Sequence, residues 1–233
     1  MRFAVDDAVF EKLRNVCFGV VVARGIDNTE RKKEIKEILD NNVEMRIEQL
    51  CGAKIKEHAG ILPYRNAFTK IGFNPNKYPC SVEALITRVI KGGQMPSINN
   101  VVDIANAISI KYILPIGAHD IDAAEEDIMV RYSVEGDKFI PFGMEVPEYL
   151  EPGELVYARG SDVKTRRWIW RQSERGKITE KSTNIFFPID GFSDSNYNEV
   201  VSARDELAHL LKELFNCKVA TGYVDVDNKT MQL

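Results

Sequence analysis

An aspartate and an asparagine, Asp103 and Asn106, stand three residues apart in a stretch whose apolar spacing predicts a helix over residues 98–110. Side chains at i and i+3 share one face of a helix, so both could point toward the same cavity. An asparagine amide could donate to a carbonyl there or hold a water. The alternative is that both side chains anchor the following loop by hydrogen bonds to its backbone. The sequence leaves both readings open.

The loop after this helix, PIGAHDID, places one histidine and two aspartates within eight residues. Residues two apart in an extended segment face the same way, so His119 points with Gly117. We expect His119 either to reach a cavity or, the preferred reading, to sit on the surface beside Asp120 and Asp122. A carboxylate at a loop turn is most often a backbone cap. Asp120 could alternatively bind an ammonium group.

Basic and aromatic residues alternate between residues 159 and 177, where seven basic residues stand against two acidic ones in a chain of net charge −4. The stretch is the best candidate for contact with phosphates, and aromatics among cations suit stacking on unpaired bases. Read as one strand, residues 163–172 place two tryptophans on the face of Lys164, Arg166 and Gln172. The predicted RNA-binding residues are Lys164, Arg166, Arg167, Trp168 and Trp170. The alternative is that both tryptophans belong to the core, with the arginine side chains running past them to solvent. If Trp170 is buried, Arg171 and Gln172 would instead line a pocket.

The composition indicates a globular chain without a metal centre or a membrane span. Hydrophobic residues make up 44% of the 233 residues, enough for a sizeable core. The net charge argues against wholesale, charge-driven binding of nucleic acid. Four cysteines without a CxxC pair and three histidines without ligand spacing predict reduced thiols and no zinc. No apolar run is long enough to cross a membrane, so we expect a cytoplasmic protein without cofactor.

Hydrophobic periodicity predicts helices first and strands later, which indicates the α+β class in a single domain over residues 1–233. The predicted helices span residues 29–50, 53–70 with an interruption at Pro63, 81–91, 98–110 and 198–215. The predicted strands span residues 16–24, 128–134, 138–143, 153–159, 162–173, 182–192 and 217–226.

Three of these segments together resemble a known module, the B3/4 tRNA-binding domain that edits in the beta chain of phenylalanyl-tRNA synthetase. The resemblance rests on SVEALITRVIKGGQMPSINNVVDIANAISIKYILPIGAHDID, RYSVEGDKFIPFG and STNIFF, and extends loosely over residues 60–215. It implies a β-rich, sandwich-like core of unusual topology with helices packed against it. It also implies a free-standing deacylase that hydrolyses mischarged tRNA in trans and has the aminoacylated 3′ end of tRNA as its partner. The oligomeric state stays open.

The resemblance also assigns site residues. Together with the residue-level reading, it predicts Asn106, His119 and Asp190 as catalytic residues. The predicted substrate-binding residues are Asp103, Asp120, Arg171, Gln172, Thr183 and Asn184. This chain has Gly117 where the family pattern has His, His119 where it has Phe, and Pro188 where it has Glu, with Asp190 as the substitute carboxylate. These departures leave the edited amino acid open, because recognising a phenol hydroxyl needs a dedicated polar partner.

The expected chemistry needs no covalent nucleophile. An aminoacyl ester is already activated, so a positioned water with donors for the developing oxyanion would suffice. Two other functions stay open: a non-catalytic tRNA- or RNA-binding protein, and a small amino-acid-binding module.

Overall fold

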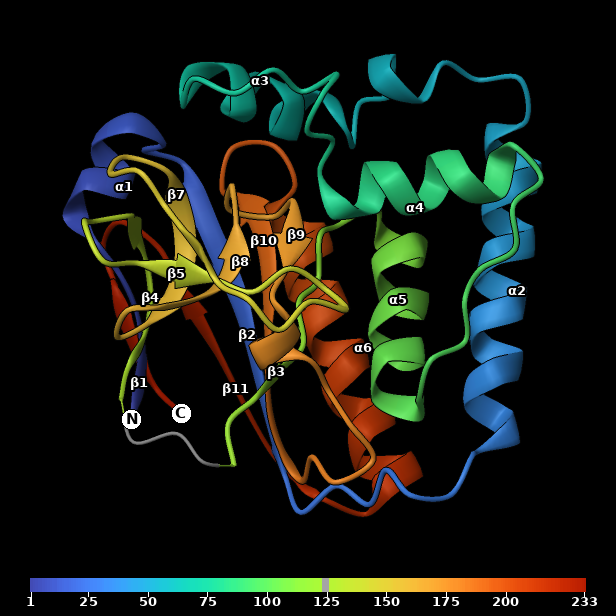
Figure 1. The fold of residues 1–233 in the computed structure, drawn as a ribbon. Helices are drawn as coiled ribbons and strands as arrows, with labels where there is room; N and C mark the ends of the chain where they lie inside the picture. Colours follow the sequence, from blue (N-terminus) through green and yellow to red (C-terminus); the bar gives the residue numbers. More distant parts are fainter. Residues whose placement is uncertain (123–125) are drawn as a thin grey trace.

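The computed structural model describes residues 1–122 and 126–233 (Figure 1). The acidic run of residues 122–127, for which the sequence predicts a solvated turn, therefore lies partly outside the described residues. No helix in the described ranges combines the length and the apolar character that crossing a membrane requires.

The strands form two sheets. In the larger sheet the order is β12–β1–β4–β7–β8–β5–β6, with β9 beside β8. Its strands are β1 (Arg2–Val5), β4 (Ile128–Tyr132), β5 (Lys138–Phe139), β6 (Glu148–Tyr149), β7 (Leu155–Arg159), β8 (Asp162–Arg166), β9 (Arg171–Gln172) and β12 (Thr230–Gln232). The smaller sheet runs β11–β2–β10–β3. Its strands are β2 (Val16–Arg24), β3 (His119–Asp120), β10 (Asn184–Phe192) and β11 (Lys218–Val224).

Aromatic side chains from both sheets meet in the core between them. Phe3 of β1 lies edge-on to Phe18 of β2, with ring centroids 5.5 Å apart, and packs on Phe186 of β10 at 4.9 Å. Tyr157 of β7 stacks on Phe3 and meets Phe18 edge-on. These large buried rings supply much of the apolar area that holds the two sheets face to face.

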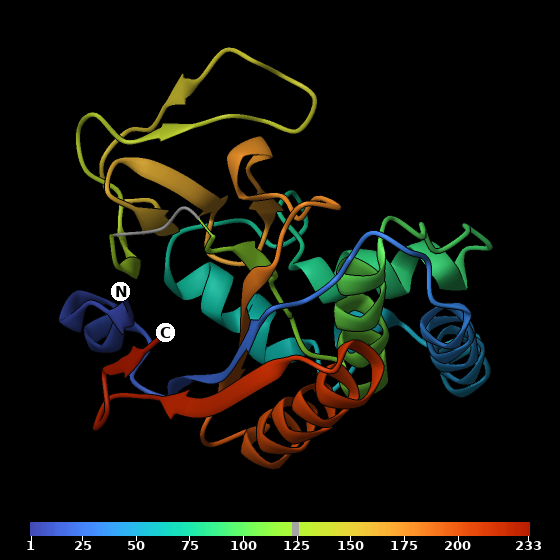
Figure 2. The same cartoon turned by 90° about the horizontal axis from the view of Figure 1, so that it is seen from below.

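Helices cover the other face of the smaller sheet (Figure 1). The helix α6 (Tyr197–Phe215) packs on β2, β10 and β11, while α5 (Asn100–Tyr112) packs between α6 and α2 (Lys33–Leu50). The remaining helices are α1 (Asp7–Lys12), α3 (Leu62–Lys70) and α4 (Ser81–Ile90). In Figure 2 the segment that carries β5 and β6, drawn in yellow, projects from the body of the molecule.

The predicted α+β class with a sandwich-like core is confirmed. Two local predictions are wrong. Pro63 does not interrupt a helix but stands in the first turn of α3, where its missing N–H costs no hydrogen bond. Residues 162–173 are not one strand, because Arg167 and Trp168 adopt left-handed backbone conformations, with φ of 47° and 60°, between β8 and β9.

Candidate functional site

A cavity of about 100 Å³ opens where the two sheets meet the turn between β8 and β9. The smaller sheet contributes β3, β10 and the segment that leads into β3, while the larger sheet contributes β7, β8 and β9. The first turn of α4 completes the wall. The lining residues are Ser81, Pro115, Ile116, Gly117, His119, Tyr157, Thr165, Trp168, Ile169, Trp170, Arg171, Gln172, Pro188 and Asp190.

Asp190 supplies a carboxylate to the cavity from the middle of the fold. Its side chain is only 2% exposed. One oxygen, Oδ1, accepts a 2.7 Å hydrogen bond from the Tyr157 hydroxyl and a 2.6 Å hydrogen bond from Trp168 Nε1. Neither bond uses Oδ2, which leaves that oxygen for a water or a ligand in the cavity. Burial raises the pKa of the Asp190 carboxyl from 3.8 to about 7, although the two hydrogen bonds oppose the rise.

His119 lines the same cavity as Asp190 and is 3% exposed. Its ring stacks on Tyr157 and on Phe186, with centroids 5.7 and 5.9 Å apart. Burial, with a smaller effect from the Lys164 ammonium, lowers the pKa of His119 to about 3, so the ring is neutral at physiological pH. Its Nδ1 is buried without a hydrogen-bond partner among the described residues. The preferred surface placement of His119 is therefore wrong, because the ring fills a slot between aromatic side chains.

Pro188 lines the cavity where β10 passes from β3 to the segment that leads into β3. Its carbonyl accepts from the Gly117 N–H at 3.0 Å, but proline has no N–H to donate in return. A Cβ added at Gly117 would lie 3.1 Å from both His119 Nε2 and Pro188 Cγ. Gly117, His119 and Pro188, at which the sequence predicts departures from the resembled family, thus lie close together in the wall.

The turn at Arg167 and Trp168 carries the second aromatic donor into the site. Two consecutive left-handed residues with side chains cost about 1–3 kcal/mol each, and the Trp168 backbone N–H is held by the Leu155 carbonyl at 2.6 Å. The turn directs the indole inward, where it is fully buried and donates to Asp190. The prediction that Trp168 lies on an outer RNA-binding face is therefore wrong.

Polar side chains line the rim of the cavity. Gln172 is held by two 2.8 Å hydrogen bonds from Nε2 to the carbonyls of Ala118 and Gly176. Arg171 is exposed and its guanidinium lies 4.7 Å from the centre of the Trp170 ring. Ser81 is the first residue of α4, and its backbone N–H donates to the Ile169 carbonyl at 2.9 Å. The expectation that Arg171 and Gln172 line a pocket thus agrees with the geometry, although Trp170 stays half-buried at the rim.

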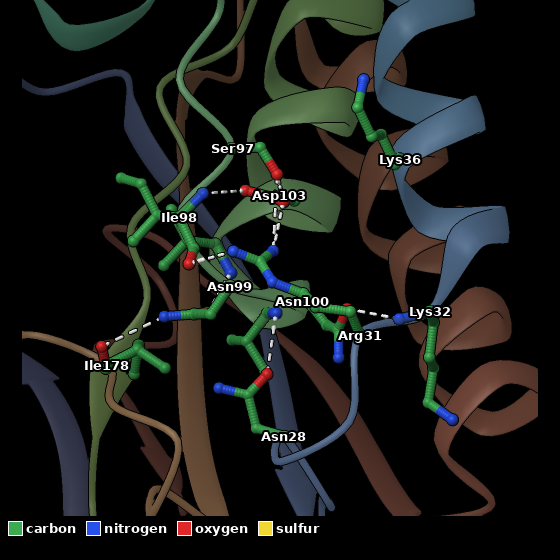
Figure 3. Close-up of polar contacts among 12 residues, drawn as sticks. Asn28, Arg31, Lys32, Lys36, Ser97, Ile98, Asn99, Asn100, Asp103 and Ile178 are labelled. Atoms are coloured by element: carbon green, nitrogen blue, oxygen red, sulfur yellow. Dashed lines mark hydrogen bonds and ion pairs between the residues drawn. The ribbon is translucent and has the colours of Figure 1, made fainter.

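Asp103 does not reach the cavity, because it closes a buried network at the start of α5 (Figure 3). Its carboxylate is 1% exposed and accepts hydrogen bonds from Ser97 Oγ at 2.5 Å, from the Ile98 backbone at 2.8 Å and from Arg31 at 2.9 Å. The anchoring alternative placed both side chains on the following loop, which is wrong for Asp103, because its carboxylate holds the preceding loop. Asn106 is half-buried on α5 and does not line the cavity either.

Three other predicted substrate-binding residues form a second anchoring network. Asp122 accepts hydrogen bonds from the backbone and hydroxyl of Thr183 and from the backbone and amide of Asn184, at 2.6–2.9 Å. Asp120 accepts from the Asp122 backbone at 2.8 Å and from the Ser182 hydroxyl. These contacts tie the loop after β3 to the start of β10, and none of the five residues lines the cavity.

Carboxylates neutralise most of the predicted basic patch. Arg166 binds Glu154 through two 2.9 Å contacts and Glu148 through one of 2.7 Å. Arg167 lies 3.6 Å from the same Glu154 carboxylate, and Lys164 is 5% exposed with its pKa lowered by burial. The outer RNA-binding face predicted for Lys164, Arg166 and Arg167 is therefore not present as a row of free cations.

Sequence reasoning missed three polar residues of the site, Tyr157, Thr165 and Ser81. Tyr157 stands in the apolar run LVYA of β7 and gave no signal beyond core packing, whereas Ser81 read only as a helix cap. Within residues 1–122 and 126–233, no group of three or more His, Cys, Asp or Glu side chains could hold a metal ion.

Residues 63–216, which include every residue that lines the cavity, match the model of the B3/4 domain family. The chain belongs to this family. The chain is also similar to two curated proteins, the phenylalanine–tRNA ligase beta subunits of Geobacter sulfurreducens and Geobacter metallireducens. Both are 28% identical to this chain, over 174 and 175 residues. The aligned region covers 63% of this chain and 22% of each relative, so the B3/4 chain spans about a fifth of their length.

A solved structure shares the fold of this B3/4 protein. The N-terminal fragment of the phenylalanyl-tRNA synthetase beta subunit from Pyrococcus horikoshii superposes with a TM-score of 0.50 over 92% of this chain and 49% of that fragment. The sequence identity is 11%, so the match concerns the fold alone.

Proposed function

We propose that this B3/4 protein is a trans-acting deacylase that hydrolyses the ester bond of mischarged tRNA. The observation that carries the proposal is the buried Asp190 carboxylate in the cavity, with a pKa of about 7 and a free Oδ2. A general base is most effective when its pKa lies near the working pH. The family relationship to synthetase beta subunits supports an aminoacyl-tRNA as the substrate.

In the proposed reaction, Asp190 Oδ2 accepts a proton from a water in the cavity. The water oxygen bonds to the ester carbonyl carbon and the carbonyl becomes an oxyanion. Collapse of this intermediate breaks the bond to the ribose oxygen, which leaves with the proton that Asp190 returns. The products are the free amino acid and the deacylated tRNA. The neutral His119 ring has one nitrogen that donates and one that accepts a hydrogen bond, so in this proposal it helps to hold the water.

The oxyanion would form at the rim, where the ester enters. Ser81 places a hydroxyl there at the first residue of α4, and the positive end of the helix dipole favours negative charge at the same end. Tyr157 and Trp168 keep Asp190 in a single orientation, so the base needs no reorganisation before the reaction.

The test is a panel of purified tRNAs, each charged with a non-cognate amino acid, in which release of the amino acid is followed over time. Asp190→Asn keeps an oxygen for the Tyr157 and Trp168 hydrogen bonds but removes the base, so we expect at least a roughly 100-fold loss of kcat. The matched control is Asp194→Asn, an exposed carboxylate outside the cavity, which should keep the full rate. Release no faster than the uncatalysed reaction for every pair would contradict the proposal.

A second candidate is an amino-acid-binding module, which is favoured by the small size of the cavity and its ionisable wall. It predicts that one free amino acid raises the melting temperature of the protein while deacylated tRNA does not. Stabilisation of that kind, combined with no hydrolysis in the tRNA panel, would favour the binding module over the deacylase.

A further inference from the structure

We propose that Trp170 and Arg171 form the binding site for the terminal nucleotide of the RNA. The base would stack on the indole and the phosphate would contact the guanidinium. This inference rests on the proposed function, because it places the ester-linked amino acid in the cavity and its ribose at the rim. Once the ester is there, the base and the 5′ phosphate of the same nucleotide must lie within about one nucleotide's length of the rim.

Trp170 is suited to stacking because it borders the cavity and is held in place. The Arg167 guanidinium lies 4.1 Å from the centre of the Tyr78 ring and 4.6 Å from that of Trp170. The two rings meet edge to face, with centroids 5.0 Å apart and planes at 77°. A third ring, Phe73, lies 5.6 Å from the same guanidinium. Arg167 therefore acts as a positioning residue that holds the Trp170 ring in place. The aromatic rings and the Glu154 carboxylate already bind the positive charge of Arg167, so it is not free for a phosphate.

Arg171 is the cation at the rim that no carboxylate neutralises within the described residues. Arg166 and Arg167 share Glu154, Arg175 pairs with Asp162 at 3.1 Å, and Lys177 pairs with Glu174. Arg171 forms no ion pair with any described residue, is exposed, and lines the cavity. Among the described residues, its guanidinium contacts the Trp170 ring and no carboxylate, so the side chain can move aside for a base and keep its charge for a phosphate.

The site would accept a single-stranded nucleotide without reading its sequence. Stacking on an indole tolerates every base because each has a π face. The neighbouring Gln172 amide already donates both of its hydrogen bonds to backbone carbonyls, so its NH₂ group cannot read a base edge. Discrimination between correct and incorrect substrates would then come from the amino acid in the cavity.

The probe is a short labelled oligonucleotide whose 3′-terminal adenosine carries an amide-linked amino acid, which resists hydrolysis. Its dissociation constant is measured by fluorescence anisotropy at several salt concentrations. We expect Trp170→Ala to weaken binding about 5- to 150-fold and Trp170→Phe to retain most of the affinity. Arg171→Ala should flatten the log–log salt dependence by about 0.7. The matched control Arg175→Ala, an exposed arginine outside the cavity, should bind as the wild type does.

A kinetic comparison separates stacking from damage to the cavity. For Trp170→Ala, the fold-loss in kcat/KM should be about 5 to 150 times larger for aminoacyl-tRNA than for an amino acid ethyl ester, which has no nucleotide. Equal losses for the two substrates would overturn the assignment of Trp170, as would unchanged oligonucleotide affinity in both Trp170→Ala and Arg171→Ala.

Failure of this inference differs from failure of the proposed function. If both Trp170→Ala and Arg171→Ala hydrolyse aminoacyl-tRNA with the wild-type rate and affinity, the nucleotide site is refuted and the deacylase function is not. If the protein binds the amide-linked probe tightly through Trp170 but hydrolyses no ester, the nucleotide site is supported and the deacylase function is refuted.

Discussion

Replacing Asp190 by asparagine should make the protein more stable at pH 8, although the residue lies at the centre of the proposed site. The wild-type carboxylate must be ionised at that pH while it is almost completely buried. Asparagine has the same shape, keeps an oxygen for the Tyr157 and Trp168 hydrogen bonds, and carries no charge. The substitution therefore removes the cost of burying a charge and leaves the packing in place.

The size of the effect follows from the two pKa values of Asp190. The pKa is 3.8 for the ordinary carboxyl and about 7 in the folded protein. Because the folded value is the higher one, the folded state holds more protons between these pH values, and stability falls as the pH rises through this window. This contribution is fully present below pH 3.8 and is lost by about pH 7. At about 1.4 kcal/mol for each pH unit, the loss amounts to roughly 4 kcal/mol.

The assay is urea unfolding of the wild type, Asp190→Asn and the control Asp194→Asn at pH 4 and at pH 8. The difference in unfolding free energy between Asp190→Asn and the wild type should be close to zero at pH 4 and a few kcal/mol in favour of the variant at pH 8. The control should show no such gap between the two pH values. A difference that is the same at pH 4 and pH 8 would refute the raised pKa and, with it, the role of Asp190 as a base near neutral pH.

Three further predictions test the neighbouring residues. Because the pKa of Asp190 is about 7 and that of His119 about 3, kcat should increase in a single step with a midpoint near pH 7. If the residual activity of Asp190→Asn shows the same increase, Asp190 is not the general base. Asp103→Ala should lower the unfolding free energy by about 2–3 kcal/mol in urea, since it leaves Arg31 and the Ile98 amide without their acceptor, while kcat stays unchanged. A fall in kcat would instead tie Asp103 to the site. Gly117→Ala should raise KM and lower the unfolding free energy by about 1–3 kcal/mol, because its Cβ would lie 3.1 Å from His119 Nε2 in the cavity wall. An unchanged KM would mean that the substrate binds elsewhere.

Local patterns in the sequence were enough to predict the elements but not how their side chains meet. The apolar run of β2 and the helical spacing of α4, α5 and α6 determine those elements directly, because each buries one repeating set of residues. The short strand β1 was not predicted, since its four residues form a strand only by pairing with β12 and β4 from distant parts of the chain.

The candidate site divides in the same way. Asp190 and His119 were named from the sequence, and the structure places both in one cavity, but for reasons of long-range packing. Asp103 and Asn106 have the spacing of a shared helix face, yet Arg31 and the loop before α5 take Asp103 for anchoring. The prediction of one strand over residues 163–172 is wrong at Trp168. The alternation of side chains between the two faces of a strand does not reveal that Arg167 and Trp168 adopt left-handed backbone conformations.

The cavity is where this fold concentrates features that lower its stability. Among the described non-glycine residues with positive φ, Ile113 and Asn216 are C-caps of α5 and α6, where a left-handed residue ends the helix. The other two, Arg167 and Trp168, end no helix, and their cost of about 1–3 kcal/mol each adds to that of the buried Asp190 carboxylate.

His119 adds to the same wall a buried Nδ1 that has no hydrogen-bond partner in residues 1–122 and 126–233. Net stabilities of domains are about 5–15 kcal/mol, so such costs are large, and substitutions as small as Asp190→Asn would remove the largest of them. These destabilising features lie around one cavity, which is expected if Asp190, Trp168 and His119 together serve the binding of a ligand. Packing alone does not explain why they lie together.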